Sequence, residues 1–295
     1  MIATIKRIGA KCTFYKLMSR IAPADNEITS ACDRIGAYRY LRRYRYVLDG
    51  LRSAEYNPTA KRHTRVWVCW LQGYDNAPNI VKHCIDSIRK YCSSMEVILI
   101  DEHNIGQYID IPSYIEDKHS RGIVPNAHYA DYIRVALLER YGGVWIDATV
   151  LLTGGLPETI EYADLFCFKT QPIGKAYASN WFIAAAARNP FIVQIKALLE
   201  EYWRREKRLV SYSIFHIFWA LIVDYSEENR KIWESVPFLS DIDRKILQME
   251  MFSPYSEKRM SEICEISPIH KLTYKYSDLD EAKTDTFYRK LFIKQ

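Results

Sequence analysis

The sequence predicts an α/β fold with a largely parallel sheet, on the basis of three observations. Short apolar segments alternate with longer stretches of helical periodicity, a rhythm that produces parallel strands joined by helices. The chain has 295 residues, 48% of them hydrophobic, and can therefore bury one large core. It contains no internal repeat and no low-complexity segment, which excludes a repeat protein and a disordered chain.

The elements are expected in a regular order from near Arg65 onward. The first strand is apolar and ends at Gln72-Gly73, and the next helix begins at Pro78, a residue that suits a first helical turn. The second strand ends at Asp101. The expected strands are residues 66–71, 96–100, 144–147, 164–168 and 181–185, and the expected helices are residues 78–91, 126–141, 190–207, 211–225 and 241–249.

Three regions of the chain differ in character. We expect residues 1–64 to form a basic helical extension, residues 65–275 the α/β body, and residues 276–295 a C-terminal tail packed on that body. Residues 1–65 contain 14 lysines and arginines against five aspartates and glutamates, a net charge of +9, whereas the whole chain has a net charge of +5. A basic segment joined to a mildly acidic body predicts an anionic surface as partner.

Two helices are expected in the extension. Residues 1–22 interleave apolar and basic side chains, a pattern typical of a helix that lies in a membrane interface; a helix packed on the body and a frayed terminus stay open as alternatives. Pro23 ends this segment. Residues 26–53 form the second helix, in which arginines and tyrosines interleave. No nucleic-acid motif accompanies that pattern, so we expect no nucleic acid as partner. We expect residues 1–52 to bind an anionic membrane surface.

Cysteines and apolar runs indicate the cellular setting. The seven cysteines are scattered and form no CxxC pair, which argues against a disulfide framework and a zinc site. The N-terminus lacks the apolar core of a signal peptide. The longest apolar run, residues 214–223, has ten residues, whereas a membrane span needs about 20. We therefore expect a cytoplasmic protein that is peripheral on the inner face of the cell membrane.

The segment ADYIRVALLERYGGVWIDATV, residues 130–150, carries the strongest sign of a site. Helical periodicity places Asp131 and Arg134 within contact distance, beside the apolar face of the helix. Charged groups beside a core are costly unless they are paired and held. After the double glycine, Asp147 ends a strand, at the edge where open α/β sheets bind ligands. The sequence therefore predicts a site at that edge of the sheet.

Several common chemistries lack support in this sequence. There is no GxGxxG or GxxxxGK[ST] loop and no serine nucleophile elbow. Hydride transfer on a dinucleotide, P-loop phosphoryl transfer and serine hydrolase chemistry are therefore not expected.

The same segment resembles the (S/A)DxxRxxxLxxxGGxYxDxD signature of glycosyltransferases with the GT-A fold, and above all their capsular polysaccharide synthesis family. Initiating mannosyltransferases of yeast and clostridial glucosylating toxins share this core. The resemblance covers roughly residues 65–275. Further segments that fit the capsular group are VWVCWLQGYDNAP, EVILIDEHN, SNWFIAAAARNPF, SYSIFHIFWA and IHKLTYK.

The resemblance implies a fold and an activity. The fold is α/β, a GT-A-type, nucleotide-sugar-binding, Rossmann-like sheet with an N-terminal helical extension and a helical C-terminal part. The activity is transfer of a sugar from a nucleotide diphosphate-sugar to a hydroxyl of a lipid-linked surface or capsular polysaccharide, with retention. Two alternatives stay open: a same-fold enzyme that glycosylates a protein, and a non-catalytic subunit of a polysaccharide assembly complex.

The resemblance also implies three catalytic residues. Asp131 and Arg134 would hold the sugar hydroxyls and the phosphates of the donor, because a carboxylate accepts from hydroxyls and a guanidinium forks onto phosphate oxygens. Asp147 matches the first aspartate of the DXD motif, which reaches the ribose and the metal shell. From the residues alone, the first two could instead fasten the helix, and Asp147 could be a turn residue.

Thr149 departs from the signature, because it stands where the second aspartate of DXD is expected. A Mn²⁺ or Mg²⁺ ion that bridges a diphosphate usually has one or two carboxylate ligands. We expect a divalent ion held by Asp147 with help from the diphosphate and His270. Two other arrangements stay open: a weak dependence on metal, and positive charge supplied by Lys271 and Arg134.

Further residues complete the expected site. On the donor side they are Trp70, Gln72, Gly73, Asp101, Asn104, Thr149 and Lys271, and on the acceptor side Asn180, Trp181 and His216. Trp70 either stacks on a uracil-type base or fills the core. Asp101 and Asn104 either touch base or ribose or form a turn. His216 either faces the acceptor or is a core histidine.

Overall fold

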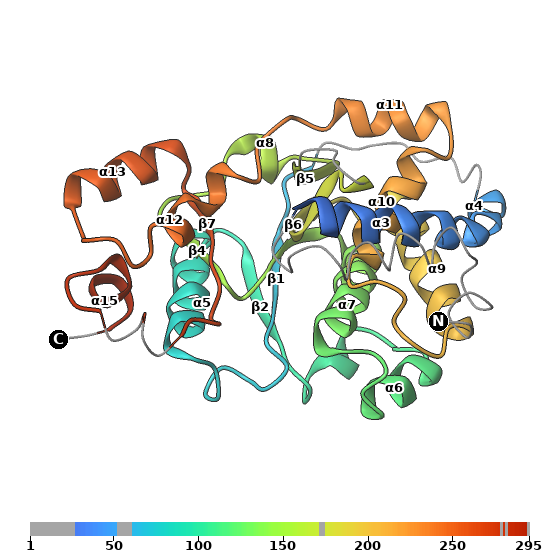
Figure 1. Cartoon of the computed structure of the whole chain (residues 1–295), viewed down its shortest axis with the longest axis horizontal. Coiled ribbons are helices and arrows are strands. Elements are labelled where there is room, and N and C mark those ends of the chain that lie inside the picture. Colours follow the sequence, from blue (N-terminus) through green and yellow to red (C-terminus); the bar gives the residue numbers. More distant parts are fainter. Residues whose placement is uncertain (1–26, 52–60, 171–174, 278–279, 281–282, 294–295) are drawn as a thin grey trace.

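A five-stranded sheet with helices on both faces forms the centre of the computed structural model (Figure 1). The structure describes residues 27–51, 61–170, 175–277, 280 and 283–293. The strand order is β2-β1-β3-β6-β5, and β4 and β7 form a second, two-stranded sheet. The strands are β1 (Arg65–Cys69), β2 (Glu96–Ile100), β3 (Gly143–Ile146), β4 (Val150–Leu152), β5 (Leu165–Lys169), β6 (Ala178–Ala185) and β7 (Ile269–Lys271).

The central sheet is mixed. β1 is parallel to both β2 and β3, as the sequence predicts, whereas β6 is antiparallel to β3 and to β5. The short connection between β5 and β6 explains why these two strands are antiparallel. It cannot hold the dozen or more residues that a parallel crossover needs. The predicted α/β architecture is therefore confirmed, with a parallel half on β1, β2 and β3 and an antiparallel half on β5 and β6.

Alternate residues of the strands enter two separate cores. On one face, Val66, Val68 and Ile146 join the core beneath α5. On the other face, Trp67 and Trp145 join the core beneath α7. The helices are therefore split between the two faces, as Figure 1 shows. Those on the first face are α5 (Asn79–Tyr91), α12 (Ile246–Met249), α13 (Glu257–Ile266) and α15 (Phe287–Phe292), and those on the second are α3 (Glu27–Leu41), α6 (Ser113–Ser120), α7 (Asn126–Tyr141), α9 (Pro190–Arg205) and α10 (Ile214–Val223).

Shorter elements complete the chain. The helices α4 (Tyr46–Asp49), α8 (Glu158–Glu161) and α11 (Glu227–Ser235) and the 3₁₀ turns η1 (Arg42–Tyr44), η2 (Ile105–Gln107) and η4 (Asp243–Lys245) lie between the larger elements. The predicted helix at residues 241–249 is in fact η4 followed by α12. Both β4 and β7 were missed, because three-residue strands give too short a pattern to read.

The N-terminal extension packs on the body through its second predicted helix. That helix is α3, interrupted by η1 and continued by α4. Its apolar side is buried: Ala37, Leu41 and Leu48 belong to the core that α9 and α10 also form. The hydroxyls of Tyr40 and Tyr44 donate to Glu206 Oε1 over 2.6 and 2.8 Å. This apolar side is thus not free to enter a membrane. The helix predicted at residues 1–22 lies outside the described residues.

The C-terminal tail is also fastened to the body. In α15, Phe287 and Phe292 are buried in the core that contains α5. The amide of Tyr288 donates to the Met251 carbonyl over 2.9 Å. Figure 1 shows α15 beside α13 and α12, at the edge farthest from α3.

The apolar run at residues 214–223 is α10, a helix of the core. Within the described ranges, the structure has no helix that is both long and apolar enough to cross a membrane. The six cysteines of those ranges are free thiols.

A double-glycine turn connects α7 to β3. Both glycines have positive φ, 65° at Gly142 and 108° at Gly143. A Cβ on Gly143 would lie 2.7 Å from the Arg65 carbonyl oxygen and 3.1 Å from Trp67 Nε1, which itself donates to the Gly142 carbonyl over 2.9 Å. The turn therefore requires glycine, and it fixes α7 against the sheet.

Gly143→Ala is expected to lower the free energy of unfolding. Forcing a non-glycine residue into a sparsely populated backbone region costs about 1–3 kcal/mol, and the contact with the Arg65 carbonyl adds to it. The matched control is Gly106→Ala, where a Cβ meets nothing within 4 Å. Urea-induced unfolding of both variants measures the difference. Equal unfolding free energies for the two variants would contradict the role of this turn.

Candidate functional site

Asp147 lies just beyond β3, at the carboxyl end of the parallel strands. Its amide donates to the Trp181 carbonyl over 2.9 Å, which continues the pairing of β3 with β6. Its Oδ1 accepts from Trp145 Nε1 at 2.9 Å and from Arg134 Nη2 at 3.1 Å. Its Oδ2 accepts from Lys271 Nζ at 2.9 Å. The Asp147 side chain is nevertheless 25% exposed, so solvent and ligands can reach it.

Arg134 connects this carboxylate to a second one. From α7 it donates through Nη1 to Asp131 Oδ1, one helical turn earlier, and through Nη2 to Asp147. Its guanidinium lies between the rings of Trp145 and Phe215, with its central carbon 4.8 and 5.5 Å from their centroids. The predicted convergence of Asp131, Arg134 and Asp147 is therefore present, and we call these three residues the site triad.

The triad differs from the expectation in one respect. Asp131 and Arg134 are each 3% exposed. Their direct contact with a donor's hydroxyls and phosphates therefore remains a prediction that the geometry does not support. The contacts they make are internal: Asp131 Oδ1 also accepts from Asn180 Nδ2 at 2.9 Å. These two residues position Asp147, whose Oδ2 accepts from Lys271.

Both carboxylates of the triad are held in the charged form. Burial on its own would raise the pKa of Asp131, but the adjacent Arg134 outweighs it and holds that pKa below its ordinary value. Burial would likewise raise the pKa of Asp147, and first Lys271 and then Arg134 hold it low. At neutral pH the triad with Lys271 therefore carries two negative and two positive charges.

Lys271 reaches the triad from β7. The pairing of β4 with β7 places it opposite Val150, and the Leu272 amide donates to the Thr149 carbonyl over 2.9 Å. The Lys271 ammonium donates to Asp147 Oδ2 at 2.9 Å and to Thr149 Oγ1 at 2.7 Å. The predicted donor-side residues Thr149 and Lys271 are thus in direct contact with each other and with Asp147.

His270 lies on the opposite side of β7 from Lys271, because successive strand residues face opposite sides. It is fully buried, and its Nε2 is 3.0 Å from Thr153 Oγ1. Burial lowers the pKa of His270 to about 4. The placement of the His270 side chain therefore does not support the expected metal ion shared with Asp147, which stays a prediction.

The Lys271 ammonium disfavours a divalent metal ion between Asp147 and Thr149. A Mg²⁺ or Mn²⁺ site needs oxygen ligands, usually with one or two carboxylates. Here a single carboxylate, Asp147, stands beside the neutral hydroxyl of Thr149, and the Lys271 ammonium occupies the space between their oxygens. Among the described residues, no group of three or more His, Cys, Asp and Glu side chains could hold a metal ion.

The loops after β1 and β2 form the adjoining part of the site. Asp101 and Asn104 make a turn: Asp101 Oδ1 accepts from the Asn104 amide at 3.0 Å, and Asn104 Nδ2 donates to the Leu99 carbonyl over 2.8 Å. These hydrogen bonds show that Asp101 and Asn104 form a turn. A Cβ on Gly73 would lie 3.9 Å from Asp101 Oδ2, so the two loops touch. Gln72 is exposed beside them.

Trp70 is half-buried in the same region. Its ring meets Tyr274 edge-on with centroids 5.2 Å apart, and its indole nitrogen is buried without a hydrogen-bond partner. Stacking of this ring on a nucleotide base stays a prediction. Tyr274, which is 40% exposed, was missed because it lies more than 200 residues from Trp70 in the sequence.

The expected acceptor residues separate into two groups. Asn180 contacts the triad through Asp131. Trp181 is 5% exposed, stacks on Phe168 at 4.8 Å and donates its indole N–H to Asp241 Oδ1 over 2.7 Å. Its core packing leaves the predicted contact with an acceptor without support. The ring centroid nevertheless lies 5.9 Å from Lys271 Nζ.

His216 and His128 flank the triad from two helices. Burial lowers the pKa of His216 to about 4, with smaller effects of the charges on Asp131 and Arg134. His128 was missed by sequence reasoning. It is 1% exposed, and its Nδ1 lies 3.4 Å from Asp131 Oδ2. Its position three residues before Asp131 is the signal that could have identified it.

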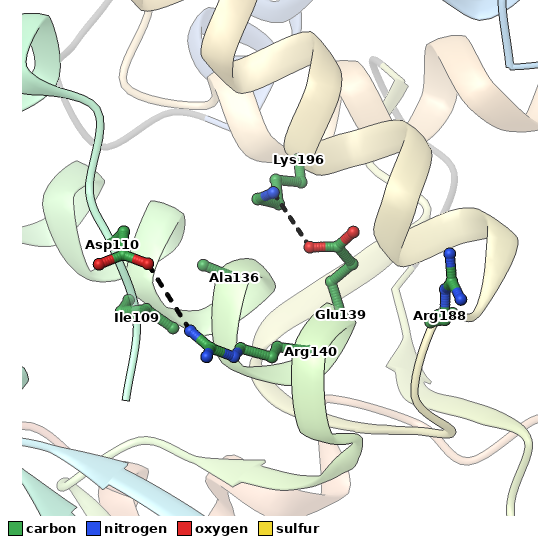
Figure 2. Close-up of a pocket in the computed structure, with 7 residues that line it drawn as sticks. All are labelled: Ile109, Asp110, Ala136, Glu139, Arg140, Arg188 and Lys196. Carbon is green, nitrogen blue, oxygen red and sulfur yellow. Dashed lines mark ion pairs between the residues drawn. The ribbon is translucent and has the colours of Figure 1, made fainter. Parts of the chain in front are cut away.

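A surface pocket of about 370 Å³ lies elsewhere (Figure 2). It is formed at the C-terminal end of α7 and the start of α9, beside the amino end of β3. Two ion pairs cross it, Arg140 with Asp110 and Lys196 with Glu139, at 3.8 and 3.0 Å. None of the predicted site residues lines this pocket. It is therefore separate from the triad, which lies at the opposite end of β3.

Comparison with known proteins identifies the family. The model of the family described as "Capsular polysaccharide synthesis protein" matches residues 38–291. The chain belongs to this family. The match includes every residue of the triad as well as Lys271 and most of the described extension.

Two individual proteins are also similar to this chain. "O-glycosyltransferase braB" of Annulohypoxylon truncatum is 29% identical over 157 residues, which cover 47% of this chain and 37% of that protein. The chain therefore matches little more than a third of the length of this curated relative. The solved structure "PaToxG Glycosyltransferase" aligns with 93% of this chain and 97% of its own, at 14% identity and a TM-score of 0.40.

Arg134→Lys is expected to destabilise the fold although it keeps the positive charge. A single ammonium cannot donate to Asp131 and Asp147 in the geometry of the guanidinium fork. We expect a loss of about 3 kcal/mol in the free energy of unfolding, the scale on which a buried ion pair is broken. Arg140→Lys is the matched control, on the same helix with a side chain 54% exposed. Chemical denaturation compares the two, and an equally small loss in both would show that Arg134 merely covers the core.

Proposed function

We propose that the chain is a glycosyltransferase that moves a sugar from a nucleotide diphosphate-sugar to a hydroxyl of a lipid-linked surface or capsular polysaccharide, with retention. Membership of the capsular polysaccharide synthesis family supports this. The name of the relative from Annulohypoxylon truncatum, an O-glycosyltransferase, agrees with transfer to an oxygen. The observation that carries the proposal is the triad, which holds Asp147 at the carboxyl ends of the parallel strands.

The proposed reaction requires a nucleoside diphosphate to leave the sugar. The bond between the anomeric carbon and the diphosphate oxygen breaks, the acceptor oxygen bonds to that carbon, and the acceptor proton is released. Negative charge develops on the leaving phosphate, and a fixed cation beside it stabilises that charge. Lys271 is the cation whose side chain is partly exposed, at 17%, next to Asp147. Asp131 and Arg134 keep Asp147 in place.

Hydrolysis of nucleotide sugars tests the proposal directly. The purified chain is incubated with UDP-, GDP- and dTDP-sugars without acceptor, once with Mn²⁺ and once with EDTA, and release of the nucleoside diphosphate is measured. We expect one donor to be hydrolysed slowly. Binding of no donor under either condition would instead indicate a non-catalytic subunit of an assembly complex.

Asp147→Asn is expected to lower this hydrolysis by about 100-fold or more, the scale of removing one preorganised electrostatic group. Asp117→Asn is the matched control, because Asp117 is an exposed carboxylate of α6 with an ordinary surface ion pair. Circular dichroism of both variants verifies the fold. Near-normal turnover in Asp147→Asn would remove Asp147 from the site.

We further propose that the protein works at the inner face of the cell membrane. The outer side of the described extension carries Arg39, Arg42 and Arg43, all exposed. Each basic residue near an anionic lipid surface contributes about 1 kcal/mol. This basic surface lies on the α3 side of the molecule, away from α13 and α15 (Figure 1).

Substitution of Arg39, Arg42 and Arg43 by Gln is therefore expected to weaken binding to phosphatidylglycerol-containing vesicles by roughly 100-fold, which corresponds to about 3 kcal/mol. The control replaces Arg89, Lys90 and Lys258, which are exposed on the other side of the sheet. Vesicle sedimentation at two salt concentrations measures both. Unchanged binding in the first variant would contradict a membrane role for this surface, and a same-fold enzyme that glycosylates a soluble protein would then be favoured.

A further inference from the structure

The ammonium of Lys271 occupies a specific place in the segment Asp147-Ala148-Thr149. It lies between the side chains at the first and third positions, 2.9 Å from Asp147 Oδ2 and 2.7 Å from Thr149 Oγ1. These two positions are those of the two aspartates in the DXD motif that the segment resembles, a motif whose carboxylates would hold a divalent cation. In this chain the place between them is taken by a cation that belongs to the polypeptide.

We propose that Lys271 replaces the divalent cation, so that the chain binds the diphosphate of its donor without a metal ion. This inference rests on the proposed function, because it concerns how the same site holds the same donor. The ligand class is a nucleoside diphosphate, and the group that recognises it is the Lys271 ammonium, supported by Asp147 and Thr149.

The charges of the two arrangements agree. Two carboxylates with one divalent cation have a net charge of zero. One carboxylate, one hydroxyl and one ammonium also have a net charge of zero. Replacing the second aspartate with Thr149 therefore removes one negative charge. Replacing the divalent metal ion with the Lys271 ammonium removes one positive charge. The site presents a diphosphate with the same balance through different groups.

The hydrogen-bond capacity of the ammonium also fits. A lysine ammonium has three N–H donors, and Lys271 uses one on Asp147 and one on Thr149. The third is left for a phosphate oxygen. Arg134 does not suit this role, because it is buried and its two Nη groups donate to the two carboxylates.

The protein holds Lys271 rigidly in this place. Its strand pairs with β4, and the Leu272 amide donates to the Thr149 carbonyl over 2.9 Å, so the backbone beside the lysine is bonded to that of the threonine. The ring of Trp181 lies 5.9 Å from the ammonium. A divalent cation bound to the same oxygens would stand next to this ammonium, and the repulsion between like charges opposes its binding.

Calorimetric titration of the full chain with UDP, GDP and dTDP, each in EDTA and in Mn²⁺, tests the proposal without any substitution. We expect the diphosphate that binds to do so with an affinity that changes less than about threefold between the two conditions. Binding that appears only with Mn²⁺ would overturn the inference while leaving the proposed function in place. Binding of none of the three under either condition would overturn both, through failure of the proposed function itself.

Two variants make the test specific. Lys271→Met should weaken diphosphate binding in EDTA by roughly 10- to 100-fold, the worth of a charge-assisted hydrogen bond. Lys258→Met, which removes an exposed lysine of α13, should bind as the native chain does. The pair Thr149→Asp with Lys271→Ala restores two carboxylates and removes the ammonium, so its binding should require Mn²⁺. Native affinity of Lys271→Met in EDTA, or metal-independent binding by the paired variant, would overturn the inference.

Discussion

A buried guanidinium between two carboxylates constrains the whole of this site. Arg134 has almost no exposed surface, and the rings of Trp145 and Phe215 keep water from it. Ion pairs in such surroundings are strong when complete and costly when broken. Because Arg134 is on α7 and Asp147 follows β3, the pairing fixes the register of the helix against the end of the strand. The glycine turn at residues 142–143 makes that close approach sterically feasible.

Solvent exposure increases along the site, from two buried side chains to two partly exposed ones. Asp131 and Arg134 are in the core, Asp147 is partly exposed, and Lys271, also partly exposed, contacts Asp147 from a different sheet. Each charge is neutralised by its neighbour, so no member is left as an isolated buried ion. Burial gives the inner residues a positioning role, and the outer two are the groups that a ligand can reach. A single line of alternating charges thus links the core to the surface.

Sequence reasoning was most accurate where structure is local. The helix, the glycine turn and the strand at residues 126–147 were predicted to within one residue, because their spacing alone brings Asp131, Arg134 and Asp147 to one edge. It does not reach outcomes that depend on distant pairing. His270 and Lys271 are adjacent, and the register of β7 against β4 decides that the lysine faces Asp147 while the histidine faces Thr153. Likewise, Trp181 lies in the core, where its indole N–H donates to Asp241, 60 residues further along the chain.

The contact between Asp147 and Lys271 joins residues 124 positions apart. During synthesis, the helix and strand that carry the triad leave the ribosome long before β7 does, and proteins begin to fold from their N-terminal parts. In that interval the Asp147 carboxylate has Arg134 and Trp145 as partners but lacks its ammonium. Under the proposed function, a chain in which β7 has not yet docked lacks the Lys271 ammonium that would receive a diphosphate. The site is therefore assembled only when β7 pairs with β4.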